Sequence, residues 1–198
     1  MSSPPRPRRF AAVLATVALL AVTGCSGDEP APSSVPTESM GEPSAAPTLQ
    51  IEPVTESGEI VGRLSRKDRK RVEETVARAA VRYLEAAYVA GDYPRSGFNG
   101  SFQAFTSGAV AVARRDRDLL TNRRIAQRVD SVTPTGLRVK VDVLAVRKRA
   151  VAATAHVRLG FRTTGRFEKR VRVQGELRLT RQDGAWKIFA YDLTKGAF

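Results

Sequence analysis

The sequence predicts an α+β domain in the C-terminal part of a 198-residue chain. Apolar residues recur at helical spacing from Val72 to Ala87, and from about residue 124 the period of the apolar pattern changes from 3.6 to 2. Long strands with one apolar and one polar face are typical of antiparallel sheets that are covered on one side only. We therefore expect helices to pack on a single face of an antiparallel sheet.

The first predicted element is a long amphipathic helix that ends at about Ala90. Ser65, followed by Asp68, forms a variant of the capping box, in which the serine hydroxyl accepts a free amide of the first turn. The carboxylate also suits the positive end of the helix dipole. Gly91 is a natural C-cap residue, and Pro94 prevents the helix from resuming.

The segment between residues 93 and 121 predicts short helices. Glycines punctuate a stretch whose three aromatic rings are expected to enter the core: Phe98, Phe102 and Phe105. Residues 109–121 carry a thin apolar stripe at helical spacing, which predicts another helix.

Four strands are predicted after these helices. Residues 137–143, 151–161 and 167–179 alternate apolar and polar side chains. Asp183-Gly184 is typical of a tight hairpin turn, and residues 186–193 form the last predicted strand.

This order of elements resembles the NTF2-like fold, a cone-shaped α+β architecture, over roughly residues 64–195. The terminal hairpin, residues 177–188, is similar to the closing strands of many such domains. Residues 189–193 are similar to the endings of actinobacterial lipoproteins and Mce-associated proteins. The resemblance implies a curved sheet wrapped over helices, leaving a cone that some members use as an active site with an Asp or His general base.

Residues 1–24 predict a signal for export. A basic start precedes an apolar stretch, residues 10–22, that is too short for a comfortable membrane span. Val22-Thr23-Gly24-Cys25 resembles a bacterial lipoprotein signal, which implies cleavage before Cys25 and diacylation of its thiol. The alternative is a structural thiol after a plain signal peptide or a short anchor helix. Cys25 is the only cysteine, so no intramolecular disulfide can form.

Residues 25–60 are expected to form a disordered tether that follows the lipidated cysteine. From residue 26 on, this segment is rich in Pro and Ser and carries seven acidic residues but no Lys or Arg. A segment so poor in aromatic residues buries too little apolar surface to offset the entropy of ordering. The folded domain is therefore expected to span residues 61–198, with order beginning near Leu64.

The predicted domain is strongly basic. Residues 61–198 carry 30 basic and 13 acidic residues, a net charge of +17. Attraction to an anionic lipid, an anionic wall polymer or an acidic envelope protein follows from that charge. Nucleic acid is disfavoured by export, and a solvated arginine-rich surface without a partner is the remaining alternative. The expected contact residues, on the polar face of the predicted sheet, are Arg158, Arg170, Arg172 and Arg178.

The sequence predicts no catalytic or metal site. His156 is the only histidine, and strand parity places it on the polar face beside Arg158. With one histidine and no free thiol after lipidation, nucleophile and metal sites lack residues, and no cofactor is expected. The candidate ligand pocket comprises three aromatic residues, more typical of plain core, and the one carboxylate whose parity matches the tryptophan: Tyr83, Tyr88, Trp186 and Asp192.

These observations predict a membrane-anchored extracytoplasmic lipoprotein with a non-catalytic binding or scaffolding domain. Two alternatives stay open at this point. One is a carrier of a lipid or another apolar ligand inside the cone. The other is a hydrolase, isomerase or dehydratase that uses Asp192 and a tyrosine.

Overall fold

A computed structural model describes residues 52–198. The predicted signal peptide, Cys25 and most of the predicted tether lie outside the described residues. All described elements belong to one compact unit, Pro43–Phe198. The strands are β1 (Val54–Val61), β2 (Val132–Val146), β3 (Arg149–Thr163), β4 (Arg170–Gln182) and β5 (Ala185–Ala197). The helices are α1 (Arg66–Leu84), α2 (Val110–Arg115), α3 (Arg117–Leu120), the π-helical η1 (Glu85–Val89) and the 3-10 turns η2 (Asn99–Ala104) and η3 (Ala126–Arg128).

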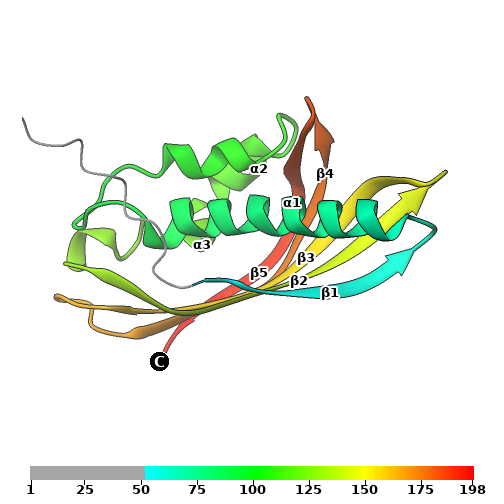
Figure 1. The fold of residues 1–198 in the computed structure, drawn as a ribbon. Helices are drawn as coiled ribbons and strands as arrows, with labels where there is room; N and C mark the ends of the chain where they lie inside the picture. The colour runs from blue at the N-terminus through cyan, green and yellow to red at the C-terminus, as the bar shows by residue number, and fades with distance from the viewer. Residues whose placement is uncertain (1–51) are drawn as a thin grey trace, which may run out of the picture. The chain divides into compact units, whose positions relative to one another are not determined.

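The described strands form one curved, five-stranded sheet in the order β1-β2-β3-β4-β5, and the helices cover one of its faces (Figure 1). Strands β2 to β5 run antiparallel to their neighbours, whereas β1 runs parallel to β2. The α+β class with a single covered face is therefore confirmed. The expectation of a purely antiparallel sheet is wrong, because β1 makes the sheet mixed.

Helix α1 and its continuation η1 confirm the predicted long helix. The Ser65 hydroxyl accepts a hydrogen bond from the amide of Asp68 at 3.1 Å, as the capping pattern predicts. The chain leaves the helical run at Ala90, and Gly91 adopts a φ of +95°, which favours glycine. The buried side of α1 packs against the apolar face of β2 and β3.

The core lies between the helices and the covered face of the sheet. The three predicted phenylalanines, Phe98, Phe102 and Phe105, are all buried. The predicted alternation also holds in β2 and β3, where every second side chain is buried over most of each strand. Phe167 differs, because β4 begins at Arg170 and Phe167 lies in the preceding loop, where its amide bonds the carbonyl of Arg128 at 2.8 Å.

Strand β1 falls in the segment predicted to be a disordered tether, so the boundary at residue 60 is wrong for residues 54–60. Its side chains are mostly exposed, and it therefore lacks the apolar alternation that signals a strand. Glu73 of α1 accepts hydrogen bonds from Ser57, at 2.9 Å, and from Arg69, at 2.8 Å. Arg69 also donates to the carbonyl of Gly58 at 3.1 Å. Polar contacts to the helix thus hold the edge strand in place.

Removal of β1 should destabilise the domain. A chain that begins at residue 62 loses the β1–β2 ladder and the contacts to Glu73, and we expect a loss of about 2 kcal/mol, or roughly 5–10 °C in Tm at this chain length. The measurement is thermal unfolding against a chain that begins at residue 52, with Ser57→Ala as a milder variant. Equal Tm values for the two truncated chains would show that β1 contributes nothing to the fold.

Candidate functional site

Two of the predicted pocket residues, Tyr83 and Tyr88, are core residues. Their rings meet edge to face at a centroid distance of 6.3 Å, and both side chains are fully buried. The hydroxyl of Tyr83 donates to the carbonyl of Leu120 at 2.9 Å, and that of Tyr88 to the carbonyl of Leu119 at 2.8 Å. Burial raises the pKa of both phenols well above the usual value. They fasten α3 to α1 and η1 and are held as neutral hydrogen-bond donors.

Tyr83 and Trp186 do share one hollow, of about 320 Å³, between α1, η2 and the start of β5. The indole nitrogen of Trp186 is buried and has no hydrogen-bond partner among the described residues. Lys187 donates to the carbonyl of Gln103 at 2.5 Å across the same hollow. The structure thus brings together two of the four predicted pocket residues.

Asp192 is exposed and is not among the residues that line the hollow beside Trp186, so its predicted placement on the face of Trp186 is wrong. The register between β4 and β5 shifts where Ile188 pairs with Leu179 and Ala190 pairs with Arg178, which leaves one extra residue, Phe189, on β5. Such a bulge reverses the side-chain alternation beyond it. Asp192 is consequently exposed, while Leu193 is buried and Tyr191 reaches the core as a partly buried residue.

The predicted arginines gather mainly at one end of the exposed sheet face. Arg158 and Arg172 are exposed there, joined by Arg138 and Arg162, which the sequence analysis did not single out. Arg158 pairs directly with Arg138 across β2 and β3, and Arg162 pairs directly with Arg170 across β3 and β4. Side chains of directly paired residues lie close together on the same face, so two pairs of like charges adjoin here.

A surface hollow of about 350 Å³ lies among these arginines, and we call it the arginine hollow. Gly136 and Gly160 contribute no side chain to it, and Glu52 is one of the residues that line it. The residues that line it are Glu52, Val54, Thr135, Gly136, Leu137, Arg138, Arg158, Gly160 and Arg172. Within residues 52–198, none of its arginines has a carboxylate within 4.0 Å. The hollow therefore presents net positive charge to solvent, with three arginines against the one carboxylate of Glu52.

Arg178 differs from the other predicted contact residues. It lies beyond the middle of the sheet, where it pairs with Thr154, and its guanidinium bonds Glu176 at 3.2 Å. His156 is on the same polar face, as predicted, between Asp142 at 2.7 Å and Glu176 at 3.6 Å. The centre of the exposed face thus has paired charges, whereas the end with the arginine hollow does not.

Asp142 connects this central cluster to the edge strand. Its second carboxylate oxygen accepts the amide of Glu59 in β1 at 2.8 Å. Burial disfavours the ionised form, but the hydrogen bonds with His156 and with Glu59 outweigh it, so the pKa of Asp142 lies below the usual value. The cluster therefore pins β1 to the sheet, a structural role for the polar residues at its centre.

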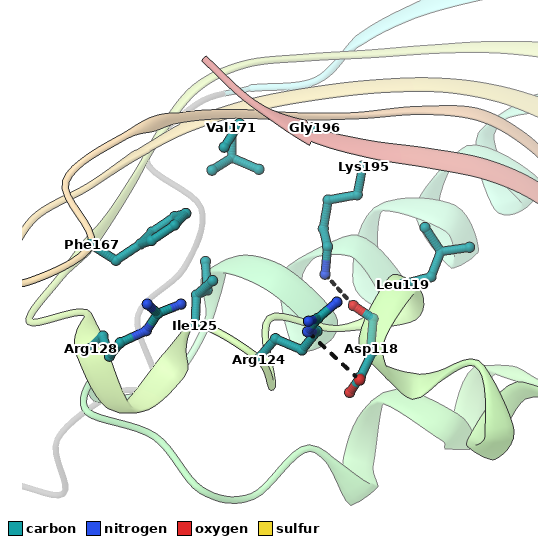
Figure 2. Close-up of a pocket in the computed structure, with 10 residues that line it drawn as sticks. Asp118, Leu119, Arg124, Ile125, Arg128, Phe167, Val171, Lys195 and Gly196 are labelled. Carbon is teal, nitrogen blue, oxygen red and sulfur yellow. Dashed lines mark hydrogen bonds and ion pairs between the residues drawn. The ribbon is translucent and has the colours of Figure 1, made fainter.

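A larger cavity, of about 520 Å³, opens on the helix side of the sheet, where β4 begins and β5 ends (Figure 2). The sheet contributes Val171 and Lys195, and the loop before β4 contributes Phe167. The full lining is Asp118, Leu119, Arg124, Ile125, Arg128, Phe167, Val171, Lys195, Gly196 and Ala197. Sequence reasoning missed this cavity, because its residues come from four separate segments and share no spacing.

Lys195 is the most unusual group in this cavity. Its ammonium donates to the carbonyl of Thr121 at 2.6 Å and to the carbonyl of Asp118, so it holds the end of α3 against β5. Burial lowers the pKa of Lys195 to about 8; the carboxylate of Asp118 opposes that shift and the guanidinium of Arg124 adds to it.

Comparison of the chain with family models, with curated proteins and with solved structures finds no match. Within the described part of the chain, no helix combines the length and apolar character needed to cross a membrane. The same residues contain no group of three or more His, Cys, Asp or Glu side chains placed to hold a metal ion.

The bulge at Phe189 predicts opposite outcomes for two neighbouring substitutions. Tyr191→Ala removes an edge-to-face contact with Phe105, at 5.9 Å, and a hydrogen bond to Asp116, at 2.5 Å. It should lower the free energy of unfolding by about 2–3 kcal/mol, whereas Asp192→Ala should change it by no more than about 0.5 kcal/mol. Urea denaturation measures both. A large loss from Asp192→Ala with little from Tyr191→Ala would contradict the bulged register.

Proposed function

We propose that this protein is an extracytoplasmic lipoprotein, anchored in the cell membrane through Cys25, whose NTF2-like domain is a non-catalytic binding module. The arginine hollow binds the anionic headgroups of the membrane surface to which the chain is tethered. The proposal rests on two pairs of directly opposed arginines, none of which forms an ion pair with a carboxylate among the described residues.

The arginine geometry supports an anionic partner. Guanidinium groups bind phosphate oxygens through paired hydrogen bonds, and five of them lie on three adjacent strands. Like charges placed directly opposite each other destabilise a sheet, and a bound anion removes that repulsion. The described residues carry 30 basic and 16 acidic side chains, so attraction to an anionic leaflet adds to the local contacts.

The NTF2-like assignment and the binding role have separate support. A long helix and shorter ones on the covered face of a curved sheet fit the predicted cone (Figure 1). Asp192, the one carboxylate considered as a base, faces away from Tyr83 and Tyr88. An enzymatic mechanism built on Asp192 and a tyrosine is therefore not the function we propose.

The lipid anchor is tested at Cys25. Cys25→Ser should leave an unprocessed precursor without lipid, because only the thiol can form the thioether, and Ser26→Ala should be processed normally as the control. The measurement is mass spectrometry of the protein from the membrane fraction. Diacyl modification or correct cleavage of the Cys25→Ser variant would contradict the anchor.

The membrane contact is tested by charge reversal. Arg158→Glu combined with Arg172→Glu should weaken binding to phosphatidylglycerol-containing vesicles by more than about tenfold at low salt, since each basic residue near an anionic bilayer contributes about 1 kcal/mol. The matched control, Arg114→Glu with Arg115→Glu, makes the same change of net charge on α2, on the opposite side of the sheet. It should weaken binding much less.

The measurement is vesicle co-sedimentation of residues 26–198, which include the whole compact unit, across a salt series. Vesicles of neutral lipid and isolated anionic wall polymer are the comparison arms. Equal losses of vesicle binding in the two double variants would show that binding depends only on the net charge of the protein. Binding to wall polymer in preference to vesicles would assign the arginine hollow to another partner.

A further inference from the structure

We propose that the cavity between the β4–β5 end of the sheet and the α3–η3 segment binds a small amphiphilic carboxylate. The carboxylate head group is attracted by the cationic side chains that line the cavity, those of Arg124, Arg128 and Lys195, and the apolar body lies against Phe167 and Val171. The cavity is on the helix side of the sheet, away from the arginine hollow (Figure 2). Ligand binding in the cavity does not depend on the proposed membrane contact.

The charge of the cavity favours an anion. Three cationic side chains line it, those of Arg124, Arg128 and Lys195, against one carboxylate, that of Asp118. Asp118 is already shared between Arg123 at 3.5 Å and Arg124 at 3.9 Å. Arg128 has no carboxylate partner among the described residues. An incoming anion therefore meets positive charge that the protein leaves uncompensated.

The walls favour an apolar body on that anion. Phe167, Val171, Leu119 and Ile125 provide apolar surface on both the sheet side and the helix side of the cavity. The guanidinium of Arg128 lies over the ring of Phe167 at 5.3 Å, so the charged and apolar parts adjoin. A volume of about 520 Å³ is within the usual range for small-molecule pockets.

The environment of Lys195 favours a single negative charge on the ligand. Two of its three donors are used by the carbonyls of Asp118 and Thr121, so one donor is left for a ligand. Since its pKa is about 8, part of its charge is absent at neutral to mildly alkaline pH. A monocarboxylate matches this limited charge better than a phosphate dianion does.

The strand β5 offers a matched pair of variants. Ala197 pairs with Val171, whose buried side chain lines the cavity, so a larger side chain at 197 extends into it. Thr194 pairs with Gln174 on the exposed face, is itself exposed and does not line the cavity. Ala197→Phe should therefore fill the cavity, whereas Thr194→Phe places the same ring on the other face of the sheet.

The test is a titration of residues 26–198 with sodium octanoate, followed by calorimetry and by amide chemical shifts. We expect saturable binding with shifts confined to the cavity, about tenfold weaker binding of 1-octanol and of octyl phosphate, and about a tenfold loss in Arg128→Gln. Ala197→Phe should abolish binding and Thr194→Phe should keep it. Arg128 is exposed, so its variant stays informative even if Ala197→Phe does not fold.

A second readout is the titration of Lys195 itself, measured by NMR of labelled lysine side chains. Octanoate should raise the pKa of Lys195 from about 8, because a bound carboxylate stabilises the ammonium. The other charged or titratable groups that face Lys195 are Asp118 and Arg124, which line the cavity, and Tyr88, whose ring lies 5.8 Å from the ammonium and whose pKa is raised by burial.

Four outcomes would overturn the proposal. They are the absence of shifts at the cavity, equal affinity for octanoate and 1-octanol, equal binding by Ala197→Phe and Thr194→Phe, and a Lys195 titration that octanoate leaves unchanged. Loss of vesicle binding in the arginine variants bears only on the proposed membrane contact, since Arg158 and Arg172 do not line this cavity.

Discussion

One face of strands β2 to β5 is buried under α1, and this burial decides which face of the sheet each side chain of these strands occupies. Because alternate residues of a strand point to opposite faces, covering one face with apolar residues commits all the intervening positions to solvent. In β4, Val171 and Val173 are buried and Arg172 between them is exposed. The charged face is thus a geometric consequence of the core, and its arginines can be exchanged without disturbing the packing beneath.

The same constraint explains what could be predicted from the sequence. The faces of β2, β3 and β4 follow from unbroken alternation, so the prediction that His156 and Arg158 lie on the polar face is correct. A bulge has no periodic signal, and one extra residue at Phe189 was enough to reverse the placement of Asp192. Strand β1 escaped prediction for another reason. It is a polar edge strand, held by hydrogen bonds to Glu73 and Asp142, which are distant in sequence.

The two proposed sites lie on opposite faces of the same strands. Val171 borders the cavity, while its neighbour Arg172 belongs to the exposed face. The cavity itself could not have been predicted from spacing, because it combines β4, β5, α3 and η3, which only the tertiary fold brings together. A ligand in the cavity would contact the inner side of β4 and β5, and a membrane surface would contact the outer side, so the two can be occupied at once.

The uneven pairing of charges on the exposed face is the feature that most needs a physical explanation. At the centre, each of the acidic residues Asp142 and Glu176 has a basic neighbour, so the local field is nearly balanced. At the end with the arginine hollow, Arg138 faces Arg158 and Arg162 faces Arg170 with no such compensation. Exposed guanidinium groups are screened by salt, which makes this repulsion tolerable, but screening does not make it favourable. The two opposed arginine pairs lower the folding stability of the isolated domain, and an anion bound across them restores that stability. That exchange of folding stability for binding is the physical reason to place the partner surface at this end of the sheet.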